Sequence, residues 1–384
     1  MEWLGHAELN FTHAPSPRKV QEKDGNVTDL LSICEKATPP CRLNPLLFNG
    51  HLQTMWTATK PAGPKIYYKR KIFDADHKIY HGTFAVDFAV EPFEAPDDPS
   101  LSRRTAYFTP EEFEHIGSDD CKPMLVVLHG LSGGSHEIYL RHTIAPLIGE
   151  GGWEVCVVNS RGCARSKITS GVLYNARATW DIRQGAVVCS NPFNLEVSSK
   201  ILQNSYIGKE VYLRVMGSAL KELAATHRTE LEKYSKIDVK AVMNITYLYE
   251  FDRLIQCPSW GYPTESAYYR DASSVDSILS IEIPFLAVHS TDDPIAVKEA
   301  IPYEEFKQNP NTVLLTSSLG GHLCWFETSG DRWFAKPVAN FLNHLAFKTD
   351  LNDLRPLVNP NNNDHLADGH GYIPMRRKLV IVED

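Results

Sequence analysis

Five short apolar runs, each only four to six residues long, give the first indication of the fold. They lie at 124–128, 153–158, 186–189, 285–288 and 312–316. A continuous apolar run that is ended by Gly or by polar residues is typical of a parallel strand buried on both faces. Helical patterns at about 137–149 and 332–346 separate or follow these runs. Strands that alternate with helices predict a mostly parallel sheet with right-handed crossovers.

The N-terminal part of the chain has a different pattern. Residues 1–45 are polar and rich in Pro, which predicts an irregular arm. Apolar and polar residues alternate at Ile66–Tyr68 and again at Gly82–Phe88, which predicts an antiparallel hairpin. The acidic, Pro-rich stretch 93–121 predicts a surface loop with a short helix. We therefore expect the α/β domain to extend over residues 46–349.

A long stretch at about 197–275 lies between the third and fourth apolar runs. It is mainly helical in pattern and includes Val211–Tyr234, a helix with few breakers. An insertion of this size after a core strand could form a cap over a pocket, or it could supply ordinary peripheral helices. The tail 350–384 is rich in Asn, Asp and Gly, so we expect it to be poorly ordered.

Composition narrows the class of protein. The net charge is −8, which gives no electrostatic footprint for nucleic acid and argues weakly against an anionic membrane surface as the main partner. The eight cysteines form no C-x-x-C pair and no cluster with metal-ligand spacing, which favours reduced thiols. Residues 1–10 lack the apolar core of a signal peptide, and no run reaches the roughly 18 apolar residues of a membrane span. We expect a soluble intracellular protein, with peripheral attachment to a lipid surface left open.

The loop after the first apolar run, His129–Ser135, contains three glycines. It satisfies the pattern G-x-S-x-G with Gly130, Ser132 and Gly134. A nucleophile elbow of this pattern belongs after a later, central strand, whereas Ser132 follows the first strand of the set. Ser132 is therefore a weak nucleophile candidate, and a simple Gly-rich turn is the alternative.

The loop Asn159–Ser166 follows the second run and contains an Arg-Gly pair. A structural role at the strand ends is the interpretation that we favour. Cys163 could be proposed as a nucleophile, but Arg165 stands where an elbow would have its second glycine.

An acid and a histidine follow the last two apolar runs. Asp293 lies just before a Pro-Ile turn, and His322 follows two glycines 29 positions later. A carboxylate at a strand end can orient a histidine that acts as a base. Asp292 is the competing acid. The alternative for Asp293 is a cap on the helix that starts near Ala296.

These motifs together resemble the family-4 α/β-hydrolases, which include bacterial YheT-type hydrolases, yeast medium-chain fatty-acid ethyl ester synthase/esterases and animal membrane-associated lipases. The resemblance covers about residues 40–346. The matching stretches are Asn44–Thr54, His129–Ser135, Asn159–Ser166, Ser190–Leu195, Tyr268–Ser274, Asp292–Pro294 and Gly320–His322. The first two are the most specific.

The resemblance implies an α/β-hydrolase fold and a serine esterase or acyl-alcohol transferase. Its substrates would be medium-chain acyl esters or thioesters, with water or an alcohol as acceptor and with no metal or organic cofactor. Asp293 and His322 would be the acid and the base, and the Gly130–Leu131 loop would give the oxyanion a backbone donor. A cytoplasmic location, with possible attachment to lipid droplets or intracellular membranes, would follow.

One part of the family pattern is missing. The family places a helix, a strand, a Gly-x-Ser-x-Gly elbow and another helix between the Arg-Gly loop and the Ser-Asn-Pro strand. Only the 22 residues 163–184 lie there. One helix of about 11 residues uses half of that length. We expect the central strand, its nucleophile and the following helix to be absent as a block. A splice form, a gene-model error or a true loss would explain this, and a non-catalytic hydrolase-like protein is the alternative function.

Overall fold

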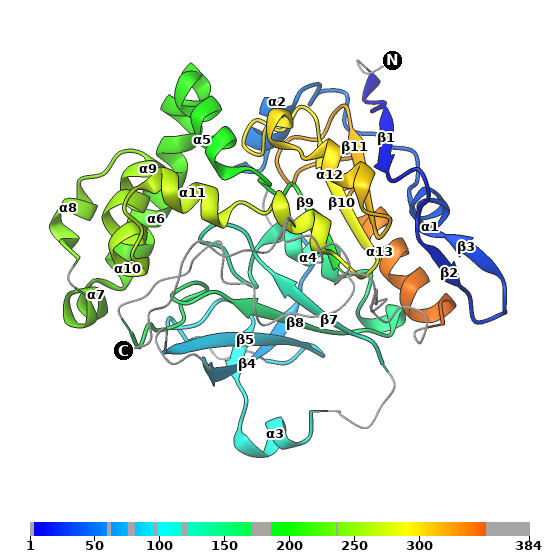
Figure 1. Cartoon of the computed structure of the whole chain (residues 1–384). Coiled ribbons are helices and arrows are strands. Elements are labelled where there is room, and N and C mark those ends of the chain that lie inside the picture. The colour runs from blue at the N-terminus through cyan, green and yellow to red at the C-terminus, as the bar shows by residue number, and fades with distance from the viewer. Residues whose placement is uncertain are drawn as a thin grey trace, which may run out of the picture. The chain divides into compact units, whose positions relative to one another are not determined.

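A computed structural model of the chain describes residues 4–59, 63–75, 81–94, 98–116, 122–170, 186–235 and 237–350 (Figure 1). The chain packs as two compact units. Unit 1 consists of Met1–Thr59, Arg183–Ser198 and Tyr269–Asp384, and unit 2 consists of Lys60–Ile182 and Ser199–Tyr268. Each unit has its own sheet and its own core.

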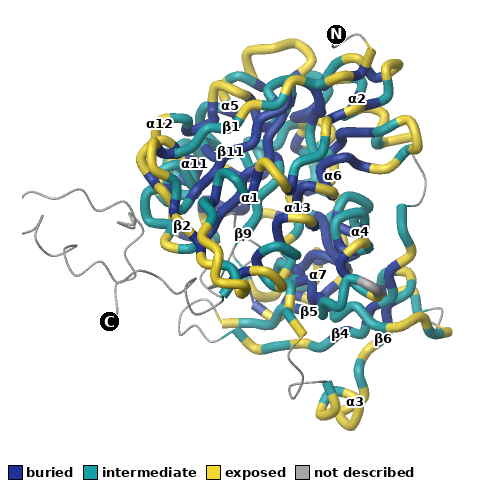
Figure 2. Tube along the Cα trace, turned by 90° about the vertical axis from the view of Figure 1, so that its right-hand side faces the viewer, coloured by how far each residue is buried: buried dark blue, intermediate teal, exposed yellow. Residues whose placement is uncertain are grey.

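The sheet of unit 1 has four strands in the order β1-β11-β10-β9. Their bounds are β1 (Leu9–His13), β9 (Ala186–Cys189), β10 (Phe285–Ser290) and β11 (Thr312–Ser317). Strand β10 pairs in parallel with both β9 and β11, whereas β1 runs antiparallel to β11. Strands β10 and β11 are buried along their whole length, and β11 is dark in Figure 2. The predicted fourth and fifth core strands are therefore confirmed, whereas the third, β9, is a strand at the predicted position whose residues are all only half-buried.

A two-stranded hairpin, several helices and short turns complete unit 1. They are β2 (Lys19–Gln21) and β3 (Val27–Asp29), which form a hairpin, α1 (Leu30–Ala37), α2 (Gly50–Trp56), η5 (Asp276–Ser280), η6 (Lys298–Ala300), α12 (Tyr303–Gln308), α13 (Ala335–Asn343) and η7 (His344–Lys348). One face of the sheet packs against aromatic side chains, among them Phe193, Phe285 and Phe306. Two helices, α5 (Leu195–Asn204) and α11 (Glu265–Ala272), lie where the chain passes between the units.

The N-terminal segment differs from the irregular arm that we expected. Over the described residues 4–45 it forms β1, the β2–β3 hairpin and α1. Strand β1 completes the edge of the sheet beside β11, and the side chains of Val20, Leu30 and Ile33 are almost wholly buried. These elements are only three to eight residues long, so their few apolar residues do not form a recognisable pattern in a mostly polar segment. Residues 351–384, where we expected a disordered tail, lie outside the described residues.

The sheet of unit 2 has five strands in the order β6-β4-β5-β8-β7. Their bounds are β4 (Tyr67–Asp74), β5 (Thr83–Val90), β6 (Thr105–Tyr107), β7 (Met124–Leu128) and β8 (Glu154–Asn159). The expected hairpin is present, because β4 and β5 pair antiparallel over eight residues. The first two predicted core strands, β7 and β8, pair in parallel.

Strand β7 does not have the position that its apolar run predicts. Among the described strands it pairs only with β8, so it forms the edge of its sheet there. Leu125 and Val127 pack on the core, but Met124, Val126 and Leu128 on the other face are about 40% exposed. The prediction of a strand buried on both faces is thus wrong for β7.

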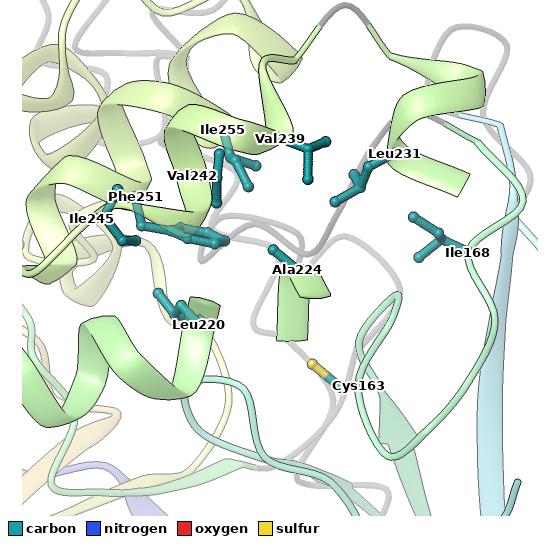
Figure 3. Close-up of a cluster of buried hydrophobic side chains, with 10 residues drawn as sticks. All are labelled: Cys163, Ile168, Leu220, Ala224, Leu231, Val239, Val242, Ile245, Phe251 and Ile255. Atoms are coloured by element: carbon teal, nitrogen blue, oxygen red, sulfur yellow. The ribbon is translucent and has the colours of Figure 1, made fainter. Parts of the chain in front are cut away.

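The remaining elements of unit 2 are helical. They are α3 (Pro110–Glu114), α4 (Ile138–Ile144), η2 (Gly149–Gly151), η3 (Gly208–Leu213), α6 (Arg214–Thr226), α7 (Arg228–Tyr234), α8 (Val239–Met243), α9 (Leu248–Phe251), η4 (Asp252–Gln256) and α10 (Cys257–Trp260). The predicted helix 211–234 breaks at His227, whose ring bonds to the Gly162 carbonyl at 2.7 Å. A buried cluster joins these helices to the loop after β8 (Figure 3).

Candidate active site

Asp293 and His322 face each other in unit 1. Asp293 lies in the loop after β10 and His322 in the loop after β11, and the carboxyl ends of two paired parallel strands share one edge of a sheet. The ring Nδ1 of His322 is 2.9 Å from Oδ2 and 3.2 Å from Oδ1 of Asp293. The Asp293 side chain is fully buried, whereas 24% of the His322 side chain is exposed. The carboxylate thus binds Nδ1, which leaves Nε2 as the ring atom that can exchange a proton.

The Asp293 carboxylate is stabilised in its charged form. Burial alone would raise its pKa, but the His322 ring and the N–H of Ile295 together hold this pKa below its ordinary value. Oδ1 accepts from the backbone N–H of Ile295 at 2.8 Å and from that of Ala296 at 2.9 Å. The alternative of a helix cap is wrong, because no helix starts near Ala296 in this described stretch: the next helical element is the short turn Lys298–Ala300, and the Asp293 carboxylate makes no hydrogen bond with its first residues.

Asp292 makes different contacts. Its Oδ1 accepts from the Ser290 hydroxyl at 2.5 Å and from the backbone N–H of Gly321 at 2.9 Å. Burial raises the pKa of Asp292. This carboxyl therefore holds the loop that carries His322, whereas Asp293 holds the ring itself.

The motif Asn44–Thr54 lies against the same loop, a role that its sequence did not reveal. Gln53 is fully buried, and its Oε1 accepts from the backbone N–H of Phe326 at 2.9 Å. A Cβ on Gly50 would lie 1.9 Å from the carbonyl oxygen of Asp292, so only glycine permits this approach. Helix α2 is therefore a packing partner of both the acid loop and the histidine loop.

The Gly-rich loop His129–Ser135 belongs to unit 2. The backbone N–H of Gly130 donates to the Tyr139 hydroxyl at 2.7 Å. Leu131 is 44% exposed, and its N–H has no hydrogen-bond partner in the part of the chain that the structure describes. Of the two predicted loop residues, Leu131 therefore has the N–H that is available to a ligand.

His129 has a structural role in this loop. Its Nε2 accepts from the backbone N–H of Ser160 at 2.9 Å, so Nδ1 carries the proton and donates to the Gly130 carbonyl at 2.7 Å. Burial lowers the pKa of His129 to about 4, which keeps the ring neutral at physiological pH.

A buried ion pair, which no sequence pattern indicated, holds the base of the same loop in place. Arg70 donates to both oxygens of Asp87 at 2.6 and 2.8 Å, and neither side chain is exposed. Asp87 also accepts from the Ser135 hydroxyl at 2.5 Å and from the Asn159 amide at 2.8 Å. Every oxygen of this buried carboxylate is satisfied, which a buried charge requires. The network gives the loop after β8 the structural role that we favoured.

The two nucleophile candidates of the sequence have different environments. Ser132 has a positive φ of 51° and lies in the turn after β7, in unit 2. The thiol of Cys163 lies among apolar side chains in the buried cluster (Figure 3), and burial raises its pKa to about 12. A thiol of this kind is not ionised near neutral pH, so Cys163 is a core residue.

The segment in which the elbow should lie is only partly described. Residues 171–185 are outside the described residues, and the expected absence of the strand–elbow–helix block falls on them. No group of three or more His, Cys, Asp or Glu side chains that could hold a metal ion occurs in the described ranges. Within those ranges, too, no helix has the length and apolarity to cross a membrane.

Comparison with known proteins places the chain among ester-hydrolysing relatives. It is 33% identical over 372 residues to a monoacylglycerol lipase of Saccharomyces cerevisiae, covering 81% of this chain and 82% of the relative. It is 26% identical to the yeast medium-chain fatty acid ethyl ester synthase/esterase 2, covering 78% and 84%. It is 28% identical to phospholipase ABHD3 of Bos taurus, covering 62% and 68%.

The comparisons with family models and with solved structures do not add to this relationship. No protein-family model matches the chain. Among solved structures, a Pyrococcus horikoshii acylaminoacyl peptidase shares 12% identity with a TM-score of 0.36, covering 87% of this chain and 46% of the peptidase. A likeness this slight carries no weight, and the relationship rests on the sequence relatives.

Proposed function

We propose that this chain, which belongs to the α/β-hydrolase superfamily and to its ester-hydrolysing members, cleaves medium-chain acyl esters by a serine–histidine–aspartate mechanism. The observation that carries the proposal is the buried Asp293 carboxylate against Nδ1 of His322. A paired ring of this kind serves as a general base toward a hydroxyl nucleophile.

The roles follow from the geometry of the pair. Asp293 orients the ring and stabilises the imidazolium that forms when Nε2 takes the proton of a serine hydroxyl. The serine oxygen attacks the acyl carbonyl, and the Leu131 N–H is the proposed donor to the oxyanion. Nε2 then returns the proton to the leaving alcohol. Water releases the acid from the acyl-enzyme, and an alcohol in its place gives a new ester.

The finer features of the substrate rest on the relatives. One is named for medium-chain ethyl esters and another for monoacylglycerol, so acyl chains of intermediate length are the proposed substrates. Such esters gather at lipid droplets and intracellular membranes. We propose that the protein meets them there from the cytoplasm, with the stretch 197–275 as a cap.

Steady-state hydrolysis of p-nitrophenyl esters tests this function. We expect octanoate to be cleaved with a higher kcat/KM than acetate or palmitate. The variant His322→Ala should lose at least about a thousandfold in kcat, as removal of a general base does in related mechanisms. His13→Asn is the matched control, because His13 lies in β1 of the same sheet but its ring bonds to the Ala14 carbonyl at 2.7 Å. A wild-type chain that cleaves none of the esters would refute the proposal.

A second function, non-catalytic binding of acyl ligands, is favoured by one observation. Only the 22 residues 163–184 lie where the family has its central strand and elbow, and the described strands form two separate sheets that end at the edge strands β7 and β9. Loss of the strand that should lie between them would remove the nucleophile but leave Asp293 and His322. Calorimetric titration with an octanoyl ether, which cannot be hydrolysed, distinguishes the functions: binding without esterase activity would favour the second.

A further inference from the structure

Three consecutive backbone N–H groups around His322 each donate to a side-chain oxygen. Gly321 donates to Oδ1 of Asp292 at 2.9 Å, His322 to Oγ1 of Thr54 at 3.0 Å, and Leu323 to Oγ of Ser190 at 3.1 Å. The three acceptors come from the loop after β10, from helix α2 and from the end of β9. We infer that these three side chains, which we name the amide clamp, position the His322 ring, and that Thr54 is its central positioning residue.

The loop needs such a clamp because its backbone is strained. Gly321 has a φ of +61° and Leu323 a φ of +57°, on either side of His322. A left-handed conformation is unfavourable for a residue such as Leu and persists only where surrounding contacts impose it. Ser190, which supplies one acceptor, also has a positive φ of 47°. Both residues of the hydrogen bond between Leu323 and Ser190 thus have an unfavourable backbone conformation, which surrounding contacts must maintain.

Helix α2 supports the loop at two points. Thr54 accepts from the N–H of His322, while the preceding Gln53 accepts from the N–H of Phe326. Gln53 is anchored in turn, since its Nε2 donates to the Leu47 carbonyl at 3.1 Å. The helix begins at a capped end, where the Asn49 side chain accepts from the N–H of Leu52 at 2.9 Å. Helix α2 is therefore held by contacts of its own, apart from those to the loop.

The clamp sets the direction of the ring through the backbone. The bond to Thr54 holds the peptide plane before residue 322, which limits where its Cβ can lie, and the bond from Nδ1 to Asp293 then orients the ring. Loss of the Thr54 acceptor would leave the N–H of His322 to seek another partner. The Nδ1–H bond to the fully buried Asp293 should weaken as a result, because it depends on a placement within about 0.5 Å.

Thr54→Val is the sharpest test, because valine has the shape of threonine without the hydroxyl. The full chain is studied by proton NMR, in which Nδ1–H of His322, bonded to a carboxylate, gives a signal far downfield. Asp293→Asn identifies that signal by removing it. We expect Thr54→Val to broaden or lose the signal and to lower kcat for p-nitrophenyl octanoate about tenfold or more, with KM within about twofold. Thr54→Ser keeps the acceptor and should restore both.

Ser190→Ala removes a second acceptor of the clamp, so it tests the inference even if Thr54→Val fails to fold. It should weaken the same NMR signal. The inference is overturned if the folded variants keep the signal at its wild-type position and kcat within about twofold. Only the predicted change in kcat rests on the proposed function. A wild-type chain without esterase activity would refute that function, and the NMR signal would still decide whether the clamp positions the ring.

Discussion

At the scale of single residues, Asp293 and Asp292 show how adjacent carboxyls acquire separate roles. Two backbone N–H groups donate to Oδ1 of Asp293 and the His322 ring contacts Oδ2, and these contacts stabilise the anion. Asp292 has one oxygen occupied by Ser290 and Gly321, and its other oxygen is buried without a partner in the described part of the chain. Burial therefore raises the pKa of Asp292, while the histidine holds that of Asp293 low.

This difference predicts unequal effects of asparagine at the two positions. Asp293→Asn removes the charge that stabilises the imidazolium, so we expect kcat for ester hydrolysis to fall by about a thousandfold or more. Asp292→Asn keeps an acceptor oxygen for the Gly321 N–H and should cost less than about tenfold. Kinetics on p-nitrophenyl octanoate compare them directly. A larger loss of kcat for Asp292→Asn than for Asp293→Asn would show that Asp292 is the acid.

His129 predicts how stability depends on pH in unit 2. The folded ring has a pKa of about 4, below the ordinary value of 6.5. Between these values the unfolded chain binds a proton that the folded chain does not, so stability falls as pH drops from 6.5 toward 4. His129→Gln should flatten the slope of unfolding free energy against pH by up to about 1.4 kcal/mol per pH unit. Urea unfolding at several pH values measures the slope, and an unchanged slope would contradict the assignment.

At the scale of elements, the contact between helix α2 and the acid loop depends on Gly50. A Cβ there would overlap the Asp292 carbonyl oxygen, so Gly50→Ala must push the two elements apart. We expect a loss of about 1–3 kcal/mol in stability, as overpacking costs elsewhere. Thermal unfolding measures the loss, and a Gly50→Ala variant as stable as the wild-type chain would show that the contact does not matter.

Strand β7 gives the second prediction at this scale. Val126 is 40% exposed on an edge strand, whereas Val157 on the neighbouring β8 is fully buried. Val126→Thr should change stability by less than about 0.5 kcal/mol, and Val157→Thr should cost about 1–3 kcal/mol. If the two variants lose equal stability, β7 is a buried strand, as its sequence suggested.

The elements also show what the sequence can predict and what it cannot. The five apolar runs located β7 to β11 because hydrophobic patterning is local information. Because Asp293 and His322 follow the last two of these runs, the sequence also placed their loops at one edge of the sheet. The clamp was not predictable, because Thr54 and Ser190 lie 268 and 133 positions from the residues that they bind. Nor was the exposure of β7, which depends on a neighbour strand and not on β7 itself.

At the scale of the whole molecule, the sheets lie in two units, each with an edge strand where the family pattern would continue. The acid–histidine pair and its clamp lie entirely within unit 1. The Gly-rich loop and its buried Arg70–Asp87 network lie within unit 2. The acid and base that we propose therefore lie on one sheet, and the oxyanion loop that we propose lies on the other.

The central claim is that this chain hydrolyses esters through His322. Labelling of the full chain with a fluorophosphonate probe, followed by mass spectrometry of the labelled peptide, tests it most directly. We expect the wild-type chain to be labelled at a single serine, and His322→Ala to be labelled at least about a hundredfold more slowly. A folded wild-type chain that takes no label, or one that is labelled equally fast without His322, would contradict the claim.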